Sequence, residues 1–242
     1  MRQNSPGTLD SDLLASWIQP QHLEHSALEE YQQTFTTHPA RMICIKNFLI
    51  PEVAQRLSNF LSKEAIFRPE FGIYSIEEAV TEEQYDAVPD VERYFRMRRM
   101  VGTHPQFMMS RNALTYVRFR QLFQHQEFKA FFETISSLPL ASSEDFGSHL
   151  MLAGDFLRPH TDNNKNRQLA LVLYLSPGWD RQCGGNLHFF NSHLTVEVIP
   201  EYNSMLAFDV LVNADHEVSV IDKGMRLSIG GWYHKREQDT ST

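Results

Sequence analysis

Apolar side chains recur three and four positions apart in two segments of the first half of the chain, residues 51–64 and 121–135. This spacing places them on one face of an amphipathic helix, and Pro51 stands where a helix can start. Residues 42–49 alternate weakly and predict a strand, whereas residues 67–89 are polar and acidic. We expect the acidic segment to be a solvated helix or loop, with a mobile lid over a site as the alternative. The helical apolar positions are Val53, Leu57, Phe60, Leu61, Leu122, Phe128, Phe131, Phe132 and Ile135.

Short apolar runs separated by turn residues replace this pattern from about residue 146 onward. They span residues 169–175, 187–190, 194–199, 205–211, 218–221 and 226–233. Many short, regularly spaced strands are typical of an all-β sandwich or barrel such as a jelly roll. We therefore predict a single domain that is mostly β with α support. Residues 1–145 would form mainly helical support and substrate-side elements, residues 146–235 the jelly-roll core, and residues 236–242 a tail.

The composition narrows the class of protein. The chain has 242 residues, of which 42% are hydrophobic, and its formal net charge is −8. It can bury a sizeable core, and its acidic balance predicts no nucleic-acid partner. The two cysteines cannot form a disulfide framework, and the longest apolar run falls far short of the roughly 20 residues of a membrane helix. Because no apolar leader is visible either, we expect a cytoplasmic protein with no membrane partner.

A possible metal site begins at His160 and Asp162, which stand two positions apart just before the run at 169–175. On an extended backbone, side chains at i and i+2 point the same way, so these two can hold one ion together. His216 is the candidate third ligand, from a distant strand. Two histidines and one carboxylate on one face of an octahedron are diagnostic of non-haem Fe(II) oxygenases. Alone, a His-x-Asp pair is a weak signal in a chain with 11 histidines.

Arg226 and Ser228 strengthen this interpretation. They stand on one face of a predicted strand, ten and twelve residues after His216. A guanidinium is a permanent cation whose planar fork matches a carboxylate. The cosubstrate 2-oxoglutarate needs a metal with open positions at its 2-oxo acid end and a cation at its far carboxylate. A zinc hydrolase could use the same three metal ligands, but it would give Arg226 no role.

The segment His-Thr-Asp-Asn-Asn-Lys-Asn-Arg-Gln-Leu-Ala-Leu-Val-Leu-Tyr-Leu-Ser-Pro-Gly-Trp-Asp (160–180), followed by Gly-Gly-Asn-Leu (184–187), resembles the prolyl-hydroxylase-like branch of the Fe(II)/2-oxoglutarate dioxygenases. The resemblance, which includes the oxygen-sensing prolyl hydroxylases, extends over residues 147–234. It implies a double-stranded β-helix, O2 as a further substrate and ascorbate as a candidate stimulant. It also implies Fe(II) ligands at His160, Asp162 and His216, and 2-oxoglutarate contacts from Arg226, Ser228 and Tyr174. Trp232 matches a family tryptophan, which packing explains equally well.

The sequence departs from the oxygen-sensing enzymes at Leu150 and Met151, where they place a second tyrosine. This difference weakens any transfer of their substrate. Asp162 matters too, because its carboxylate fills the coordination position that a halide would need. Hydroxylation is therefore favoured over halogenation, while desaturation and ring formation, which begin with the same oxidant, stay open.

The substrate is open at this point. We expect hydroxylation of an amino-acid-like small molecule, free or carrier-linked, with release of succinate and CO2. His149, Arg98 and Arg118 are candidate contacts, because an arginine could hold a substrate carboxylate. The alternative substrate is a prolyl residue in a translation-related protein. A different class, a non-catalytic jelly-roll module that binds metal or ligand, conflicts with an intact ligand set. The oligomeric state is left open.

Overall fold

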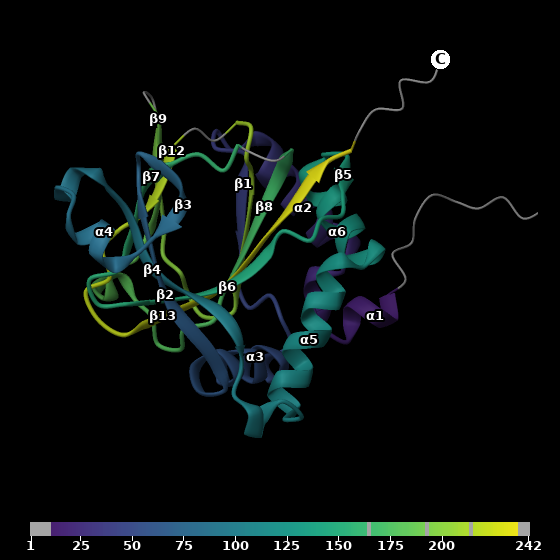
Figure 1. Cartoon of the computed structure of the whole chain (residues 1–242). Coiled ribbons are helices and arrows are strands. Elements are labelled where there is room, and N and C mark those ends of the chain that lie inside the picture. The colour runs from purple at the N-terminus through teal and green to yellow at the C-terminus, as the bar shows by residue number, and fades with distance from the viewer. Residues whose placement is uncertain (1–10, 164–165, 192–193, 213–214, 237–242) are drawn as a thin grey trace, which may run out of the picture.

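The computed structural model describes residues 11–163, 166–191, 194–212 and 215–236 (Figure 1). Its α-helices are α1 (Ser11–Ala15), α2 (His25–Thr37), α3 (Pro51–Lys63), α4 (Glu82–Asp86), α5 (Arg111–Gln124) and α6 (Gln126–Ser136). Its strands are β1 (Met42–Ile45), β2 (Ala65–Ile73), β3 (Ile76–Val80), β4 (Arg93–Thr103), β5 (Leu140–Ala141), β6 (Phe146–Leu152), β7 (Phe156–His160), β8 (Arg167–Tyr174), β9 (Leu187–Asn191), β10 (Leu194–Val198), β11 (Ser204–Asp209), β12 (Asp215–Val218) and β13 (Met225–Lys235). None of the helices in the described ranges is long and apolar enough to cross a membrane.

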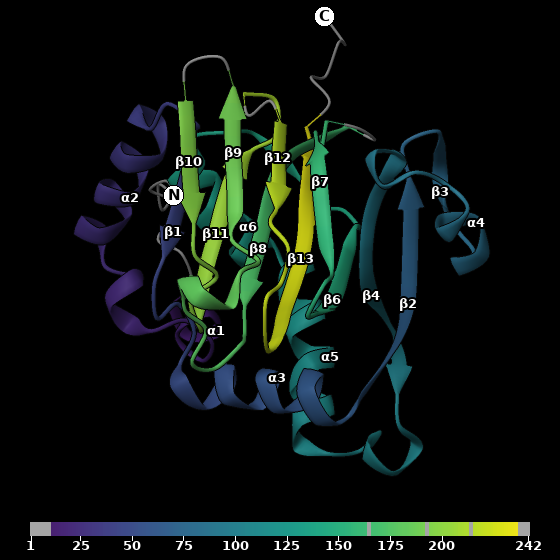
Figure 2. The ribbon, with the colours of Figure 1, turned by 90° about the vertical axis from the view of Figure 1, so that its left-hand side faces the viewer.

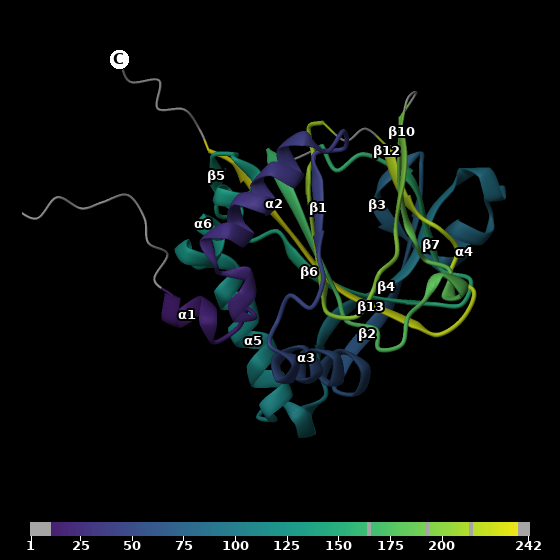
Figure 3. The same cartoon turned by 180° about the vertical axis from the view of Figure 1, so that it is seen from behind.

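The strands follow each other in the order β1-β11-β8-β13-β6-β4-β7-β12-β9-β10, and the sheet curls back on itself. Strands β10, β9, β12 and β7 form the near wall in Figure 2, and β1, β11, β8, β13 and β6 form the opposite wall. Helices α1, α2, α5 and α6 cover the outer face of that second wall (Figures 1 and 3). This arrangement confirms the predicted jelly roll with helical support.

The alternation of side chains on β8 explains why its apolar run has no polar positions. Leu169, Leu171 and Leu173 point outward into the core beneath the helices, whereas Ala170 and Tyr174 point into the roll. Both faces are therefore buried, and a strand buried on both faces is apolar throughout.

Strand β13 has the same geometry with a different composition. Leu227, Ile229 and Tyr233 pack beneath the helices, and the Tyr233 hydroxyl donates a hydrogen bond to the Phe123 carbonyl of α5 at 2.6 Å. The intervening residues face the interior of the roll and line its cavity: Arg226, Ser228, Gly230 and Trp232. The strand thus anchors the core with one face and supplies polar groups to a site with the other.

Residues 65–103 differ from the prediction of a mainly helical first half. Strands β2, β3 and β4 form an antiparallel unit, and β4 pairs with both β6 and β7. The acidic segment 67–89 is therefore mostly a β-hairpin followed by the short helix α4. The hydrophobic pattern did not predict strand β4, because the strand is half-buried along nearly all of its length and carries several arginines.

Smaller boundaries also differ. The single helix expected over residues 121–135 is two helices, because the backbone of His125 is extended (φ −73°, ψ 139°). The strand expected at 218–221 lies earlier, at Asp215–Val218. Of the predicted tail, residues 237–242 lie outside the described residues.

Candidate active site

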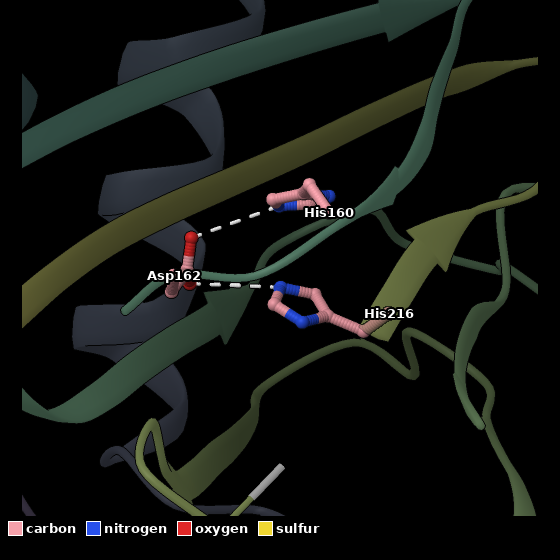
Figure 4. A group of neighbouring side chains, drawn as sticks. All are labelled: His160, Asp162 and His216. Atoms are coloured by element: carbon pink, nitrogen blue, oxygen red, sulfur yellow. Dashed lines mark ion pairs between the residues drawn. The ribbon is translucent and has the colours of Figure 1, made fainter. Parts of the chain in front are cut away.

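Three predicted metal ligands meet at the end of β7. His160 is the last residue of this strand, and it pairs across the ladder with His216 on β12. Asp162 follows in the loop after β7. Its Oδ1 lies 3.6 Å from His160 Nε2 and its Oδ2 lies 3.6 Å from His216 Nε2 (Figure 4). The ligand atoms all lie within 4.8 Å of one another, so a single ion can be held by all three residues.

The electrostatics of these residues suit metal binding. Burial, together with the neighbouring His216, lowers the pKa of His160 to about 4. Burial alone would raise the pKa of Asp162, but its interactions with His216, His160 and Trp232 outweigh burial and lower this pKa to about 2. At neutral pH His160 is thus an unprotonated imidazole and Asp162 a carboxylate, which are the protonation states that metal ligands require. Nitrogen and carboxylate donors in this set match Fe(II).

A buried cation lies on the adjoining wall. Arg226 on β13 is only 4% exposed, and burial lowers its pKa. Its Nε donates to the Gly185 carbonyl at 2.9 Å, its Nη1 lies 3.8 Å from Met151 Sδ, and its guanidinium lies 5.1 Å from the centre of the Tyr174 ring. Within the described ranges no carboxylate pairs with it. Since a buried charge without a counter-ion is costly, the site is complementary to an anion.

Tyr174 and Ser228 stand beside this cation. They are paired residues of β8 and β13, and both are buried. The Tyr174 hydroxyl has no hydrogen-bond partner among the described residues, and burial raises its pKa to about 12. It is therefore a neutral donor, aligned with Arg226 for the same anion. This arrangement is the one expected for the distal carboxylate of 2-oxoglutarate.

One cavity of about 250 Å³ joins the metal ligands to the anion site. His149 on β6 also lines it, next to Ser228 in the ladder. Burial and the charges of Arg99 and Arg226 lower the pKa of His149 to about 4, so this side chain enters the cavity as a neutral imidazole. The remaining wall is largely apolar and includes Met97, Met151, Leu157, Val172, Leu187, Phe208 and Val218.

Two predicted substrate contacts lie elsewhere. Arg98 is paired with the buried carboxylate of Asp155, which also accepts from Arg96 Nε at 3.0 Å. Arg118 lies on the exposed side of α5. Neither lines the cavity: a buried acid holds the first, and helix geometry turns the second to solvent.

The cavity lining also includes residues that were not predicted as site residues, among them Tyr94, Arg167 and Trp232. Tyr94 of β4 meets His160 edge-on, with ring centres 5.7 Å apart, and stacks on Tyr74 from the β2–β3 turn at 5.1 Å. The Tyr74 hydroxyl donates to the Pro159 carbonyl at 3.2 Å, which fastens the hairpin beside the metal ligands. Arg167 and Trp232 line the same cavity. Trp232 was detectable in principle, since it shares its strand face with Arg226.

The second half of the chain matches a known family. Residues 147–234 match the model of the 2OG-Fe(II) oxygenase superfamily. Over this segment the chain is similar to that superfamily. The resemblance seen in the sequence is therefore confirmed, and Fe(II), 2-oxoglutarate and O2 are the cofactor and substrates that the superfamily implies. The residues present fit them, through the His-Asp-His set and through Arg226, a buried cation that no described carboxylate pairs with.

Several relatives are similar to this chain. The mouse prolyl 3-hydroxylase OGFOD1 is 30% identical over 118 residues, which are 45% of this chain and 22% of that protein. The Xenopus laevis prolyl 3-hydroxylase OGFOD1 is 28% identical over 118 residues, 45% of this chain and 23% of that protein. The match thus spans about a fifth of the length of these curated relatives.

Solved structures share the fold. A Pseudomonas putida prolyl-4-hydroxylase aligns with a TM-score of 0.57 and 19% identity, covering 87% of this chain and all of that one. A Trichoplax adhaerens prolyl hydroxylase, solved with a peptide of the hypoxia inducible factor oxygen degradation domain, aligns with a TM-score of 0.59 and 16% identity, covering 88% of this chain and 94% of that one.

Proposed function

We propose that this chain is an Fe(II)/2-oxoglutarate-dependent hydroxylase that acts on a prolyl residue within a polypeptide. The observation that carries the reaction class is the buried Arg226, which has no counter-ion among the described residues and shares a cavity with His160, Asp162 and His216. When bound, Fe(II), 2-oxoglutarate and O2 supply an oxidative decarboxylation to succinate and CO2 that is coupled to hydroxylation of a substrate C–H bond.

The chain's own residues bind, orient and shield. His160, Asp162 and His216 would hold the metal, while Arg226 and the Tyr174 hydroxyl would hold the distal carboxylate of 2-oxoglutarate. The apolar side chains around them keep water from the reacting groups, which strengthens every charge interaction in the cavity. No general base is required at the reacting carbon.

Two findings support a polypeptide substrate over the amino-acid-like small molecule expected from the sequence. The curated relatives are prolyl hydroxylases, and one structural neighbour was solved with a peptide. In addition, a second hollow of about 400 Å³ adjoins the cavity and shares part of its lining with it. A chain that places one residue in the cavity has a continuous surface on which to extend. The shared residues are Phe95, Met97, His149, Arg167 and Trp232.

The positions of the two candidate substrate-binding arginines also support a polypeptide substrate. An enzyme for a free amino acid needs a cation for the substrate carboxylate. Arg98 and Arg118 lie outside the cavity, and the lining cations are Arg226 at the cosubstrate end and Arg167, which is already paired with Asp145 at 2.7 Å.

The test is succinate formation in air with Fe(II), ascorbate and 2-oxoglutarate, comparing proline-containing peptides with the free amino acids. We expect a peptide to stimulate turnover and to gain 16 mass units at proline, and His160→Ala to abolish both signals. His188→Ala is the matched control, because His188 pairs with Glu197 and Glu217 outside the cavity. Stimulation by a free amino acid alone would replace the polypeptide substrate with the small molecule. If wild-type protein bound neither metal nor 2-oxoglutarate, the reaction class itself would be wrong.

A further inference from the structure

The carboxylate of Asp162 has partners besides the two histidines. The indole Nε1 of Trp232 donates a hydrogen bond to Oδ2 at 3.0 Å. On the other side, Nη1 of Arg167 lies 3.6 Å from Oδ1. Each oxygen of this metal-binding carboxylate is thus held by a group from β13 or β8, and turning the carboxylate about its side-chain bond would break both contacts.

The two supporting side chains also hold each other. The guanidinium carbon of Arg167 lies 3.7 Å from the centre of the Trp232 ring, a cation–π contact at close range. The Nε of Arg167 donates to Asp145 Oδ2 at 2.7 Å, which fixes the direction of the side chain. The same loop holds the strand, since the backbone N–H of Trp232 donates to the Asp145 carbonyl at 3.0 Å. Arg167 is therefore clamped from three sides, and its side chain is only 12% exposed.

We propose that Trp232 and Arg167 are positioning residues that fix the orientation of the Asp162 carboxylate for metal binding. This inference rests on the metal site of the proposed function. Groups that orient a metal-binding carboxylate determine how much of its binding free energy is realised, because a mobile ligand must be ordered when the ion binds. Their removal characteristically lowers metal affinity about 10- to 100-fold.

A Trp232 side chain that served only for packing could be replaced by phenylalanine without an effect on metal binding. Phenylalanine at this position keeps an aromatic face for Arg167 and keeps the backbone contacts with Asp145, but it lacks the N–H that reaches Asp162. Trp232→Phe therefore separates the hydrogen bond from the packing. Trp179→Phe is the matched control, since Trp179 is also largely buried and donates its indole N–H to a backbone carbonyl, that of Gly184, at 3.1 Å outside the cavity.

The experiment titrates the metal-free 242-residue chain with Co(II) alone, following the visible absorption of the bound ion and the heat of binding, with no 2-oxoglutarate present. We expect the dissociation constant to rise 10- to 100-fold in Trp232→Phe and to stay at the wild-type value in Trp179→Phe. Thermal unfolding of the metal-free proteins checks that the two variants are equally folded. The absorption spectrum of bound Co(II) should change in Trp232→Phe, because the geometry of one ligand has changed.

Arg167→Gln provides a second, separate test, which also serves if Trp232→Phe does not fold. It leaves the indole in place and removes the cation, and we again expect at least 10-fold weaker Co(II) binding. Wild-type affinity and spectrum in a folded Trp232→Phe or Arg167→Gln would overturn the assigned role of that residue. Failure of the wild-type protein itself to bind Co(II) would overturn the proposed function and this inference together.

Discussion

Arg226→Met is the substitution whose outcome follows most directly from the structure. It removes a positive charge while keeping an unbranched side chain. Arg226 is only 4% exposed, and its guanidinium contacts the neutral Gly185 carbonyl, the Met151 sulfur and the Tyr174 ring. Because an unpaired buried ion costs several kcal/mol, we expect the ligand-free variant to be at least as stable as the wild type.

Binding of 2-oxoglutarate should change in the opposite direction. Its distal carboxylate would pair with Arg226 in a nearly dry site, and removing one partner of such a pair costs about 3–5 kcal/mol. At about 1.4 kcal/mol per factor of ten, this corresponds to roughly 100- to 5,000-fold weaker binding.

The assay is thermal and denaturant unfolding of the Mn(II)-loaded proteins at increasing 2-oxoglutarate. At 100 times its dissociation constant, a ligand stabilises the folded state by about 2.7 kcal/mol. If the constant has risen at least 100-fold, the same concentration stabilises Arg226→Met by no more than about 0.4 kcal/mol. The stabilisation by 2-oxoglutarate should therefore almost disappear.

Arg98→Met is the control and should show the reverse pattern. Arg98 pairs with Asp155, which is 1% exposed and lies outside the cavity. Loss of this partner should destabilise the ligand-free protein yet leave the stabilisation by 2-oxoglutarate intact. The reasoning is refuted if Arg226→Met keeps the full stabilisation by 2-oxoglutarate, or if its ligand-free form is less stable than that of Arg98→Met.

Three further outcomes are expected. Gly231→Ala should lower the free energy of unfolding by about 1–3 kcal/mol, because the new Cβ would lie 2.5 Å from the Phe123 ring. Gly230→Ala is the control and should unfold like the wild type, because the atom nearest to its new Cβ is 3.8 Å away. Equal losses of stability in the two variants would contradict this. Tyr174→Phe should weaken 2-oxoglutarate binding about 10-fold by calorimetry without destabilising the ligand-free protein, since it removes a buried hydroxyl that has no hydrogen-bond partner among the described residues. The pKa of His149 is lowered from 6.5 to about 4 in the folded protein. Between pH 6.5 and pH 4 the unfolded chain therefore binds a proton at His149 that the folded protein does not bind. The stability that His149 contributes is complete above pH 6.5 and is lost as the pH falls toward 4. His149→Gln should flatten the metal-free stability profile between these values by up to roughly 3 kcal/mol, and an unchanged slope would remove His149 as its cause.

Much of the second half of the chain was readable from its sequence. The runs at 169–175 and 205–208 are apolar at successive positions because β8 and β11 are buried on both faces. His160 and Asp162, two positions apart, were recognisable from the sequence as two ligands of one ion. Their side chains lie together because the backbone of β7 is extended up to His160. Arg226 and Ser228 were equally recognisable from the sequence, because residues two positions apart on a strand face the same side. Trp232, six positions after Arg226, faces that side as well.

Other features depend on contacts that no local pattern records. Strand β4 has no hydrophobic period, because it lies half-buried between β2 and the two strands β6 and β7. Arg98 was a reasonable candidate for a substrate contact because it is a cation, but it pairs with the buried Asp155, which is 57 residues away in the chain. His125 divides one apolar pattern into two helices, although its neighbours on both sides favour helix.

The amino-acid sequence thus determined which groups are available for chemistry, because ligand identity and strand parity are local properties. Tertiary structure alone decided how strongly each group is held. It placed Trp232 and Arg167 beside the Asp162 carboxylate, buried Arg226 with no counter-ion in the part of the chain that the structure describes, and placed the Tyr74–Tyr94 pair beside His160. These relations join segments that are far apart in the chain, and their energies depend on distance and burial, which only the folded structure defines.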